Sequence, residues 1–300
     1  MPRSENLLAA LTMMASMAFF VVNDTAMKMM AGDVPLFQLL MLRGAITSLL
    51  VAGLAWRMGA FRARPTGRDW RLISLRTGAE IGATVCFLTA LFNMPIANVT
   101  AIIQVLPLTV TLGAALIFGE TVGWRRLLAI AIGFVGVMLI VRPWSEAFTI
   151  WSVYALLAVL CITVRDLSTR RLSAATPSLF VTFVTSFAIM TVFGLLQIGE
   201  PFTPMSIREV SLVTFAAICI IGAYLFSIMV MRIGEISFSA PFRFTSLLWA
   251  LLLGWVVFGD WPEPPVLVGA GVVVGSGLFM LYREAQIARQ KMREPRLRLH

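Results

Sequence analysis

Residues 97–120 read ANVTAIIQVLPLTVTLGAALIFGE, and residues 237–260 read SFSAPFRFTSLLWALLLGWVVFGD. Each stretch begins with small and polar residues, continues through an apolar run and closes on Phe-Gly-acid. The first closing triplet is Phe118-Gly119-Glu120 and the second is Phe258-Gly259-Asp260, so the motif recurs after nearly half of the chain. This recurrence predicts two related halves.

The composition indicates a protein that crosses the membrane several times. The chain is 59% hydrophobic and 13% charged, whereas soluble domains are about 45–50% apolar and about 25% charged. Its three cysteines lie apart inside apolar runs, and its one histidine is residue 300. This pattern argues against disulfides, a zinc site and a histidine proton relay. We therefore expect no metal and no cofactor, and we attribute the net charge of +9 to loops at the membrane rather than to nucleic-acid binding.

A helix needs about 20 apolar residues to cross a membrane, and ten runs satisfy this length. They cover residues 7–29, 35–56, 72–93, 97–118, 124–141, 150–169, 177–198, 209–230, 237–258 and 264–282. Ten crossings place both termini on one side, which carries eighteen of the 24 Lys and Arg residues against three on the opposite side. The positive-inside rule predicts that both termini are cytoplasmic.

Because each half has five helices, an odd number, the second half enters the membrane from the opposite side. Two further matches support this duplication: Asp24-x3-Lys28 recurs as Asp166-x3-Arg170, and Pro35 recurs as Pro177. We expect an all-α fold with two inverted repeats, residues 1–145 and 146–283, followed by a basic cytoplasmic tail, 284–300. Inverted repeats are typical of secondary transporters, whose substrate site lies near the midplane between the halves.

Several of these apolar helices carry a polar face, which we expect to point away from lipid. The members are Thr100, Gln104 and Thr111 in 97–118; Ser239, Arg243 and Ser246 in 237–258; Thr77, Glu80 and Thr84 in 72–93; and Thr12, Ser16 and Asn23 in 7–29. One interpretation is a central cavity lined by these faces, in which Gln104 and Arg243 lie opposite each other. The other is that the hydroxyl groups bond backbone carbonyls and pack helices together.

Charged residues inside these helices cost about 2.5–3.5 kcal/mol each at the helix centre, so each needs a role. Glu80 is either a proton or cation acceptor or a member of a structural ion pair, for instance with Arg76. Arg243 either holds a carboxylate or extends to the cytoplasmic edge. Asp24 and Lys28, predicted to pair one helical turn apart, act either as a gate or as an anchor.

Aromatic residues and glycines suggest a pocket and a packing face. Tyr224 and Phe244 fall in the middle of predicted helices, where they suit an apolar pocket for an amphiphilic metabolite. Glycines gather on 124–141 and 264–282, and they include Gly271-x3-Gly275. Such motifs bring helices close together. They predict either internal packing of a monomer, the interpretation that we favour, or a dimer through these two helices.

Two five-helix halves, each with an apolar helix capped by Phe-Gly-acid and followed by a Gly-rich helix, resemble the EamA-type repeats of the drug/metabolite transporter superfamily. Leu106-Pro107 ahead of Phe118-Gly119-Glu120 fits this pattern, whereas the second repeat has Leu247 at the proline position. The overall likeness is greatest to the YddG-type exporters of aromatic and other amino acids. The resemblance implies an alternating-access carrier of the bacterial inner membrane in which Gln104 and Leu106 contact the substrate.

Two hypotheses about the cargo are consistent with these residues. The first hypothesis is an amino-acid exporter, and the alternative is an exporter of another metabolite or of a cationic drug. If protons are coupled, Glu80, Asp24 and Asp166 are the candidate carriers. The chain has no G-x4-G-K-[ST] motif for ATP and no nucleophile–base cluster for an enzyme.

Overall fold

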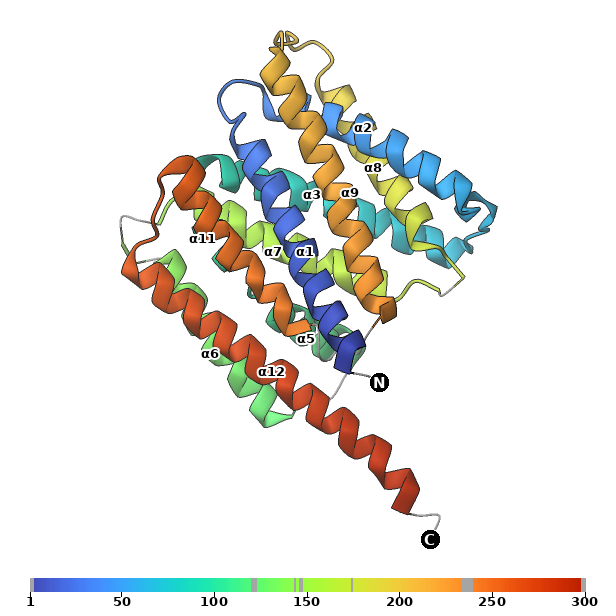
Figure 1. The fold of residues 1–300 in the computed structure, drawn as a ribbon, viewed down its shortest axis with the longest axis vertical. Helices are drawn as coiled ribbons and strands as arrows, with labels where there is room; N and C mark the ends of the chain where they lie inside the picture. Colours follow the sequence, from blue (N-terminus) through green and yellow to red (C-terminus); the bar gives the residue numbers. More distant parts are fainter. Residues whose placement is uncertain are drawn as a thin grey trace.

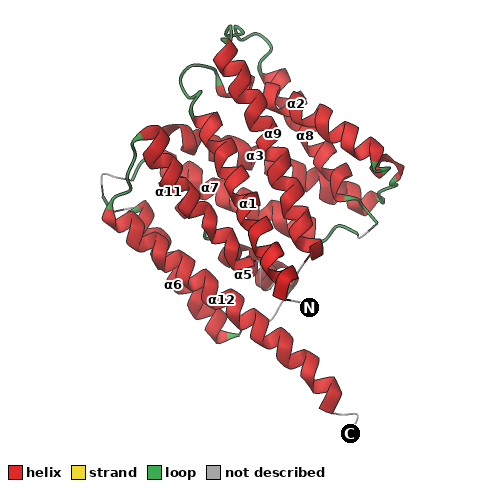
Figure 2. Cartoon of the chain, in the orientation of Figure 1, coloured by secondary structure: helices red, strands yellow, loops and turns green. Residues whose placement is uncertain are grey.

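The computed structural model describes residues 3–119, 123–142, 144–145, 148–173, 175–233 and 240–297, and within these ranges the chain forms helices and no strand (Figures 1 and 2). The α-helices are α1 Arg3–Lys28, α2 Leu36–Arg57, α3 Gly67–Asn93, α4 Ile96–Ile103, α5 Leu106–Phe118, α6 Trp124–Val141, α7 Ile150–Arg170, α8 Ser178–Leu196, α9 Ile207–Ile233, α11 Thr245–Phe258 and α12 Pro264–Leu297. Two short 3₁₀ helices, η1 Ala60–Arg62 and η2 Ala240–Phe244, complete the list. Glu120 and Ser239, which the sequence placed at helix ends, lie outside the described residues.

In the described part of the chain, seven helical segments are long and apolar enough to cross a membrane, and three shorter ones are apolar as well. These ten segments correspond to the ten predicted runs, and the all-α, polytopic fold is confirmed. Both termini lie at the same end of the bundle (Figure 1), as an even number of crossings requires. The main difference in bounds is α12, which continues to Leu297 instead of ending near residue 282.

Helix α3 begins earlier than the apolar pattern predicted because polar residues cap it. The Thr66 hydroxyl accepts a hydrogen bond from the Asp69 backbone N–H, and the Asp69 carboxylate accepts one from the Thr66 N–H. This is a capping box. The same carboxylate also accepts a hydrogen bond from the Ser173 N–H at 3.1 Å. The start of α3 is thereby tied to the end of α7 in the other half of the chain.

The predicted helix 97–118 is broken into α4 and α5 at Gln104 and Val105. Pro107 is the second residue of α5, where its missing N–H is tolerated, but it cannot donate to the Ile103 carbonyl as a continuous helix would require. The second repeat contains a matching break, since η2 ends at Phe244 and α11 begins at Thr245. Gln104 and Phe244 are separated along the chain by the same offset as the two Phe-Gly-acid triplets.

The glycines of the two triplets end their helices in the same way. Gly119 has φ +67° and Gly259 has φ +72°. Both occupy the left-handed conformation that glycine adopts most readily just past a helix C-terminus. The N–H of each donates to a carbonyl of the last turn, on Ala115 and Trp255 respectively. The repeated motif is therefore a helix stop used twice.

The packing of helices follows the inverted repeat. Helix α1 packs along α9, and its equivalent α7 packs along α3; likewise α1 contacts α11, and α7 contacts α5. Two pairs of equivalents pack against each other, namely α2 with α8 and α6 with α12, while α4, which ends at the first break, contacts α11, which begins at the second. Figure 1 shows α6 and α12 side by side at one edge of the bundle, while α2 and α8 lie at the opposite edge. The breaks of both repeats therefore meet at the middle.

Helices α6 and α12 cross where glycines face each other. A Cβ atom added to Gly269 would lie 2.6 Å from the Gly136 carbonyl oxygen, and one added to Gly136 would lie 2.9 Å from the Gly269 oxygen. A Cβ atom at Gly271 or Gly275, by contrast, would meet nothing within 4 Å. The glycine face predicted from the sequence thus divides into an internal contact and an open Gly271-x3-Gly275 edge.

Candidate functional site

Residues at the two helix breaks form hydrogen bonds with each other between the two repeats. The Gln104 side-chain amide donates to the Phe244 carbonyl oxygen at 3.2 Å and to the Ser246 hydroxyl at 3.0 Å. Gln104 and Phe244 are both buried. This contact joins the two repeats at equivalent positions, and it places Gln104 beside the segment that carries Arg243.

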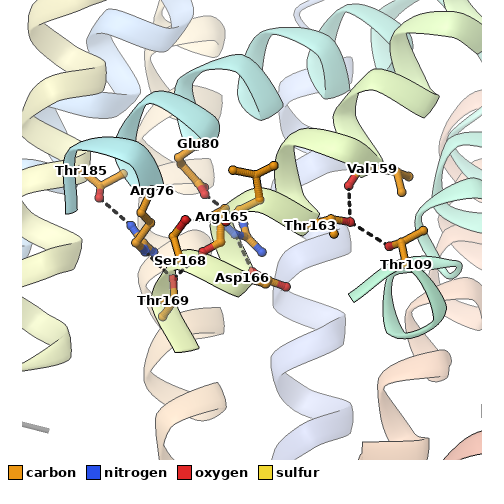
Figure 3. A network of polar contacts seen from close by, with 11 residues as sticks. Arg76, Glu80, Thr109, Val159, Thr163, Arg165, Asp166, Ser168, Thr169 and Thr185 are labelled. Carbon is orange, nitrogen blue, oxygen red and sulfur yellow. Dashed lines mark hydrogen bonds and ion pairs between the residues drawn. The ribbon is translucent and has the colours of Figure 1, made fainter. Parts of the chain in front are cut away.

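A group of paired charges lies between α3 and α7 (Figure 3). The Arg165 guanidinium contacts the Glu80 carboxylate, Nη1 to Oε2, at 3.0 Å. It also contacts the Asp166 carboxylate, Nε to Oδ1, at 2.8 Å. The side chains of Glu80, Arg165 and Asp166 are 12%, 22% and 30% exposed. Two acids therefore share one arginine in a half-buried position.

Arg76 is not the partner of Glu80, although the two lie one helical turn apart. Its guanidinium donates instead to the Thr169 hydroxyl at 3.0 Å and to the Thr185 hydroxyl at 2.6 Å, as Figure 3 shows. The structural ion pair considered for Glu80 thus exists, but with Arg165 from the other half. Sequence reasoning missed Arg165 because it was counted among the basic residues of a cytoplasmic end. The adjoining Asp166, inside the same apolar helix, was the available signal.

A second polar group joins α1 and α2. The Asn23 amide donates to the Asp24 carboxylate at 2.9 Å, and the Asn23 oxygen accepts a long contact of 3.5 Å from Arg43. Arg43 lies within coulombic range of Asp24, Glu80 and Tyr224. Arg43 is a charged residue within the apolar helix α2, and these groups are its partners. The two polar groups are therefore electrostatically connected through Arg43 and Tyr224.

Tyr224 and Arg243 belong to the same region and come from α9 and η2. The Tyr224 ring packs edge-on against Phe20 of α1, with ring centroids 5.6 Å apart. Arg243 is solvent-exposed and lies within coulombic range of Asp166 and Arg165. Among the described residues, the Arg243 guanidinium has no hydrogen-bond or ion-pair partner, so within this part of the chain it is available to an anionic group.

The ion pair predicted between Asp24 and Lys28 is wrong for the described chain. The Lys28 ammonium donates instead to the Met94 carbonyl oxygen, and it lies 3.9 Å from the Asp260 carboxylate. Asp24 points to Asn23 and Arg43. The physical reason is that long-range partners beyond the ends of α3 and α11 satisfy Lys28 better than a pair within one turn of its own helix, which contributes only about 0.2–0.5 kcal/mol.

The remaining predicted residues are placed as follows. Thr84 is half-buried on α3, one turn from Glu80. Thr100 is buried on α4, and Leu106 is buried at the start of α5 in the apolar core. Thr111 donates to the Pro107 carbonyl oxygen of its own helix at 2.8 Å, so for this residue the backbone-bonding alternative holds. The polar residues of 97–118 therefore have different roles: Gln104 bonds to the other half of the chain, whereas Thr111 bonds to a carbonyl of its own helix.

Comparison with known proteins finds the same two repeats that the structure shows. The model of the EamA-like transporter family matches residues 7–142 and again residues 149–282. A riboflavin transporter of Vibrio cholerae is 26% identical over 92% of this chain and 93% of its own length. A pseudopaline exporter of Pseudomonas aeruginosa is 23% identical over 88% of this chain and 92% of its length. An S-adenosylmethionine uptake transporter of Rickettsia prowazekii is 22% identical over 63% of this chain and 64% of its length.

A solved crystal structure of a protein shares the fold. It covers 93% of this chain and 98% of its own, with a TM-score of 0.62 and 21% sequence identity. The similarity extends over both repeats and supports the arrangement of helices alone.

Proposed function

This chain belongs to the EamA-like transporter family, and we propose that it is a secondary carrier that exports amino acids by alternating access. The family and the apolar helices make it a multi-pass membrane transporter of small molecules rather than an enzyme. The finer proposal places it in the bacterial inner membrane with both termini in the cytoplasm. It also takes aromatic and other amino acids as the cargo.

The observation that carries this proposal is the Arg243 guanidinium, unpaired among the described residues and within coulombic range of Asp166. An amino acid brings one carboxylate and one ammonium group. Arginine suits the carboxylate because it offers paired donors that match the two oxygens. Glu80 and Asp166 supply carboxylates in the same region, and a carboxylate suits the ammonium group. A zwitterion would therefore find a partner for each of its charges.

Apolar and aromatic surroundings agree with a side chain of some size. Phe20 and Tyr224 pack together near the charged residues, and Phe244 is buried beside Gln104. Pockets with an apolar wall and a few convergent polar groups are the usual form of small-molecule sites. Gln104, Thr84 and Thr100 would add hydrogen-bonding groups at the wall, and Leu106 and Phe244 would add apolar surface.

The names of the relatives favour a second candidate, the transport of another metabolite, and one relative, the pseudopaline protein, is named an exporter. The Vibrio cholerae protein is a riboflavin transporter, and riboflavin has no zwitterionic group. The Rickettsia protein takes up S-adenosylmethionine, which does carry an amino-acid group. A cationic drug is a further alternative, since Glu80 and Asp166 could neutralise it.

A counterflow experiment with purified protein in liposomes tests the proposal. Labelled phenylalanine should accumulate in vesicles preloaded with unlabelled amino acids, and Arg243→Gln should reduce this flux about 10- to 100-fold because a charged hydrogen bond contributes roughly 1.5–3 kcal/mol. Arg125→Gln is the matched control, since Arg125 is exposed beside Trp124 at the start of α6. Flux that responds to riboflavin but to no amino acid would refute the cargo.

The variant Glu80→Gln separates the cationic-drug alternative. If the substrate is a cation, removal of this carboxylate should abolish transport. If it is a zwitterion held mainly by Arg243 and Asp166, transport should persist at a reduced rate.

A further inference from the structure

The two copies of the Phe-Gly-acid motif each lie under a cation from the other half of the chain. The Arg171 guanidinium lies 3.9 Å from the ring centroid of Phe118 at the end of α5. The Lys28 ammonium lies 5.1 Å from the ring centroid of Phe258 at the end of α11. Cations positioned within about 6 Å of an aromatic ring face are attracted to it. Two such contacts therefore recur at matching places.

These contacts are equivalent under the inverted repeat. Phe118 and Phe258 open the two triplets, and Lys28 and Arg171, at the ends of α1 and α7, are separated by nearly the same offset along the chain. Each contact joins helices from different halves, α1 with α11 and α7 with α5. Because the repeats run in opposite directions through the membrane, the two contacts belong to opposite faces. The Lys28 contact lies on the face that we predict to be outside, and the Arg171 contact lies on the cytoplasmic face.

The Lys28 contact has additional bonds. The same ammonium donates to the Met94 carbonyl oxygen between α3 and α4, and it lies 3.9 Å from the Asp260 carboxylate. The Lys28 side chain is only 11% exposed, whereas Arg171 is exposed. One cation therefore ties together α1, the α3–α4 connection and the end of α11 on a single face.

We propose that these contacts are the two gates of the carrier: an outer gate of Lys28, Phe258 and Asp260, and an inner gate of Arg171 and Phe118. Opening the cavity to one face requires separating α1 from α11, while opening it to the other requires separating α7 from α5. Each gate must therefore break in one of the two open states and hold in the other. This inference rests on the alternating access proposed above, and it does not depend on the cargo.

Weakening one gate should shift the protein toward the state in which that gate is open. A cation–π contact contributes about 0.5–1 kcal/mol when exposed and about 2 when desolvated, so its loss should change the ratio of open states about 2- to 30-fold. Loss of the outer gate and loss of the inner gate should act in opposite directions. This opposition distinguishes gates from contacts that merely hold the fold together.

Cysteine accessibility measures this ratio without a substrate. In a background with Cys86, Cys161 and Cys219 replaced by alanine, Thr84→Cys on α3 and Ser246→Cys on α11 serve as separate reporters. A membrane-impermeant maleimide is applied to right-side-out and to inverted vesicles. Lys28→Gln and Phe258→Leu should raise labelling from the outside about 2- to 30-fold and lower it from the inside. Arg171→Gln and Phe118→Leu should do the reverse.

Three controls complete the design. Phe258→Tyr and Phe118→Tyr keep an aromatic ring and should behave as the parent protein. Trp124→Leu removes a cation–π contact with its neighbour Arg125 on the same helix, so it should leave the labelling ratio unchanged. The double variant of Lys28→Gln with Arg171→Gln should return the ratio toward that of the parent, which a misfolded protein would not do.

The proposal is overturned if outer-gate and inner-gate variants change labelling in the same direction. It is equally overturned if they leave the ratio unchanged, or if neither reporter is labelled from either face in any variant. A failed counterflow assay combined with opposed labelling shifts would reject the amino-acid cargo and retain the gates.

Discussion

Arg165 is the residue on which the charged site depends, because its guanidinium contacts both Glu80 and Asp166. Replacing it by methionine would leave two half-buried carboxylates without this cation. We expect Arg165→Met to lower the free energy of unfolding by up to about 3 kcal/mol. This value is at the low end of the range for breaking a buried ion pair, because these side chains keep some exposure. Thermal unfolding of the purified protein in detergent measures this loss.

The double variant Arg165→Met with Glu80→Gln separates lost charge balance from lost packing. It removes one acid together with the arginine, so it should recover a substantial part of the stability lost in Arg165→Met. Arg165→Lys keeps the charge but has no fork of donors for two carboxylates, and it should fall between the parent and the methionine variant. A double variant no more stable than Arg165→Met would show that the ion pairs do not govern stability.

At the scale of residues, the sequence reveals the types of functional groups better than their partners. Glu80 and Arg243 stand out because a charge inside an apolar run demands an explanation. Their neighbours do not, because a partner 85 residues away, as for Glu80 and Arg165, leaves no local pattern. The same difficulty explains the incorrect pairing of Asp24 with Lys28, where the nearest opposite charge in the sequence was not the nearest in space.

At the scale of elements, the crossing of α6 and α12 permits a sharp comparison of two glycines. A Cβ atom at Gly269 would collide with the Gly136 carbonyl oxygen at 2.6 Å, whereas one at Gly271 would meet open space. We expect Gly269→Val to separate the helices and to cost at least about 1–3 kcal/mol, as overpacking of a close contact does. Gly271→Val, on the same helix, is the matched control for valine itself. Melting temperatures measured side by side give the answer, and equal losses would contradict the close crossing.

Helix breaks show how far the sequence predicts the shape of an element. The apolar run 97–118 predicted one continuous helix, and the structure divides it into α4 and α5. Pro107 is the residue in the sequence that indicates this break. The equivalent break before α11 has no proline at Leu247. There the Thr245 hydroxyl donates to the Phe242 carbonyl oxygen and the Ser246 hydroxyl to that of Arg243. Such local bonds compete with helical ones, and they are hard to distinguish from ordinary serine and threonine packing in a sequence.

At the scale of the whole molecule, the sequence repeat was the most informative feature, because it predicted the arrangement of the helices. An odd number of helices per half implies inversion, and the structure shows the resulting pairs of equivalent helices. What the repeat could not supply is the difference between its copies. Gln104 in the first half faces the Phe244 carbonyl in the second, so one centre is made from two unlike residues. A substrate site can therefore be asymmetric although the helices around it are related by symmetry.

The orientation of the molecule provides the final prediction. The sequence assigned eighteen basic residues to the face with both termini against three to the other, and seventeen of the eighteen remain once Arg165 is placed inside the bundle. Such a bias sets the direction in which loops cross the membrane. We therefore expect Arg64→Cys, in the connection between α2 and α3, to react with an impermeant maleimide only after cells are permeabilised. Glu200→Cys, between α8 and α9, should react in intact cells. Both positions are exposed, so a difference in reaction reports the face and not the burial of the side chain. Reaction of Arg64→Cys in intact cells, with Glu200→Cys protected, would show that the orientation is opposite to the predicted one, and the assignments of the outer and inner gates would then be exchanged.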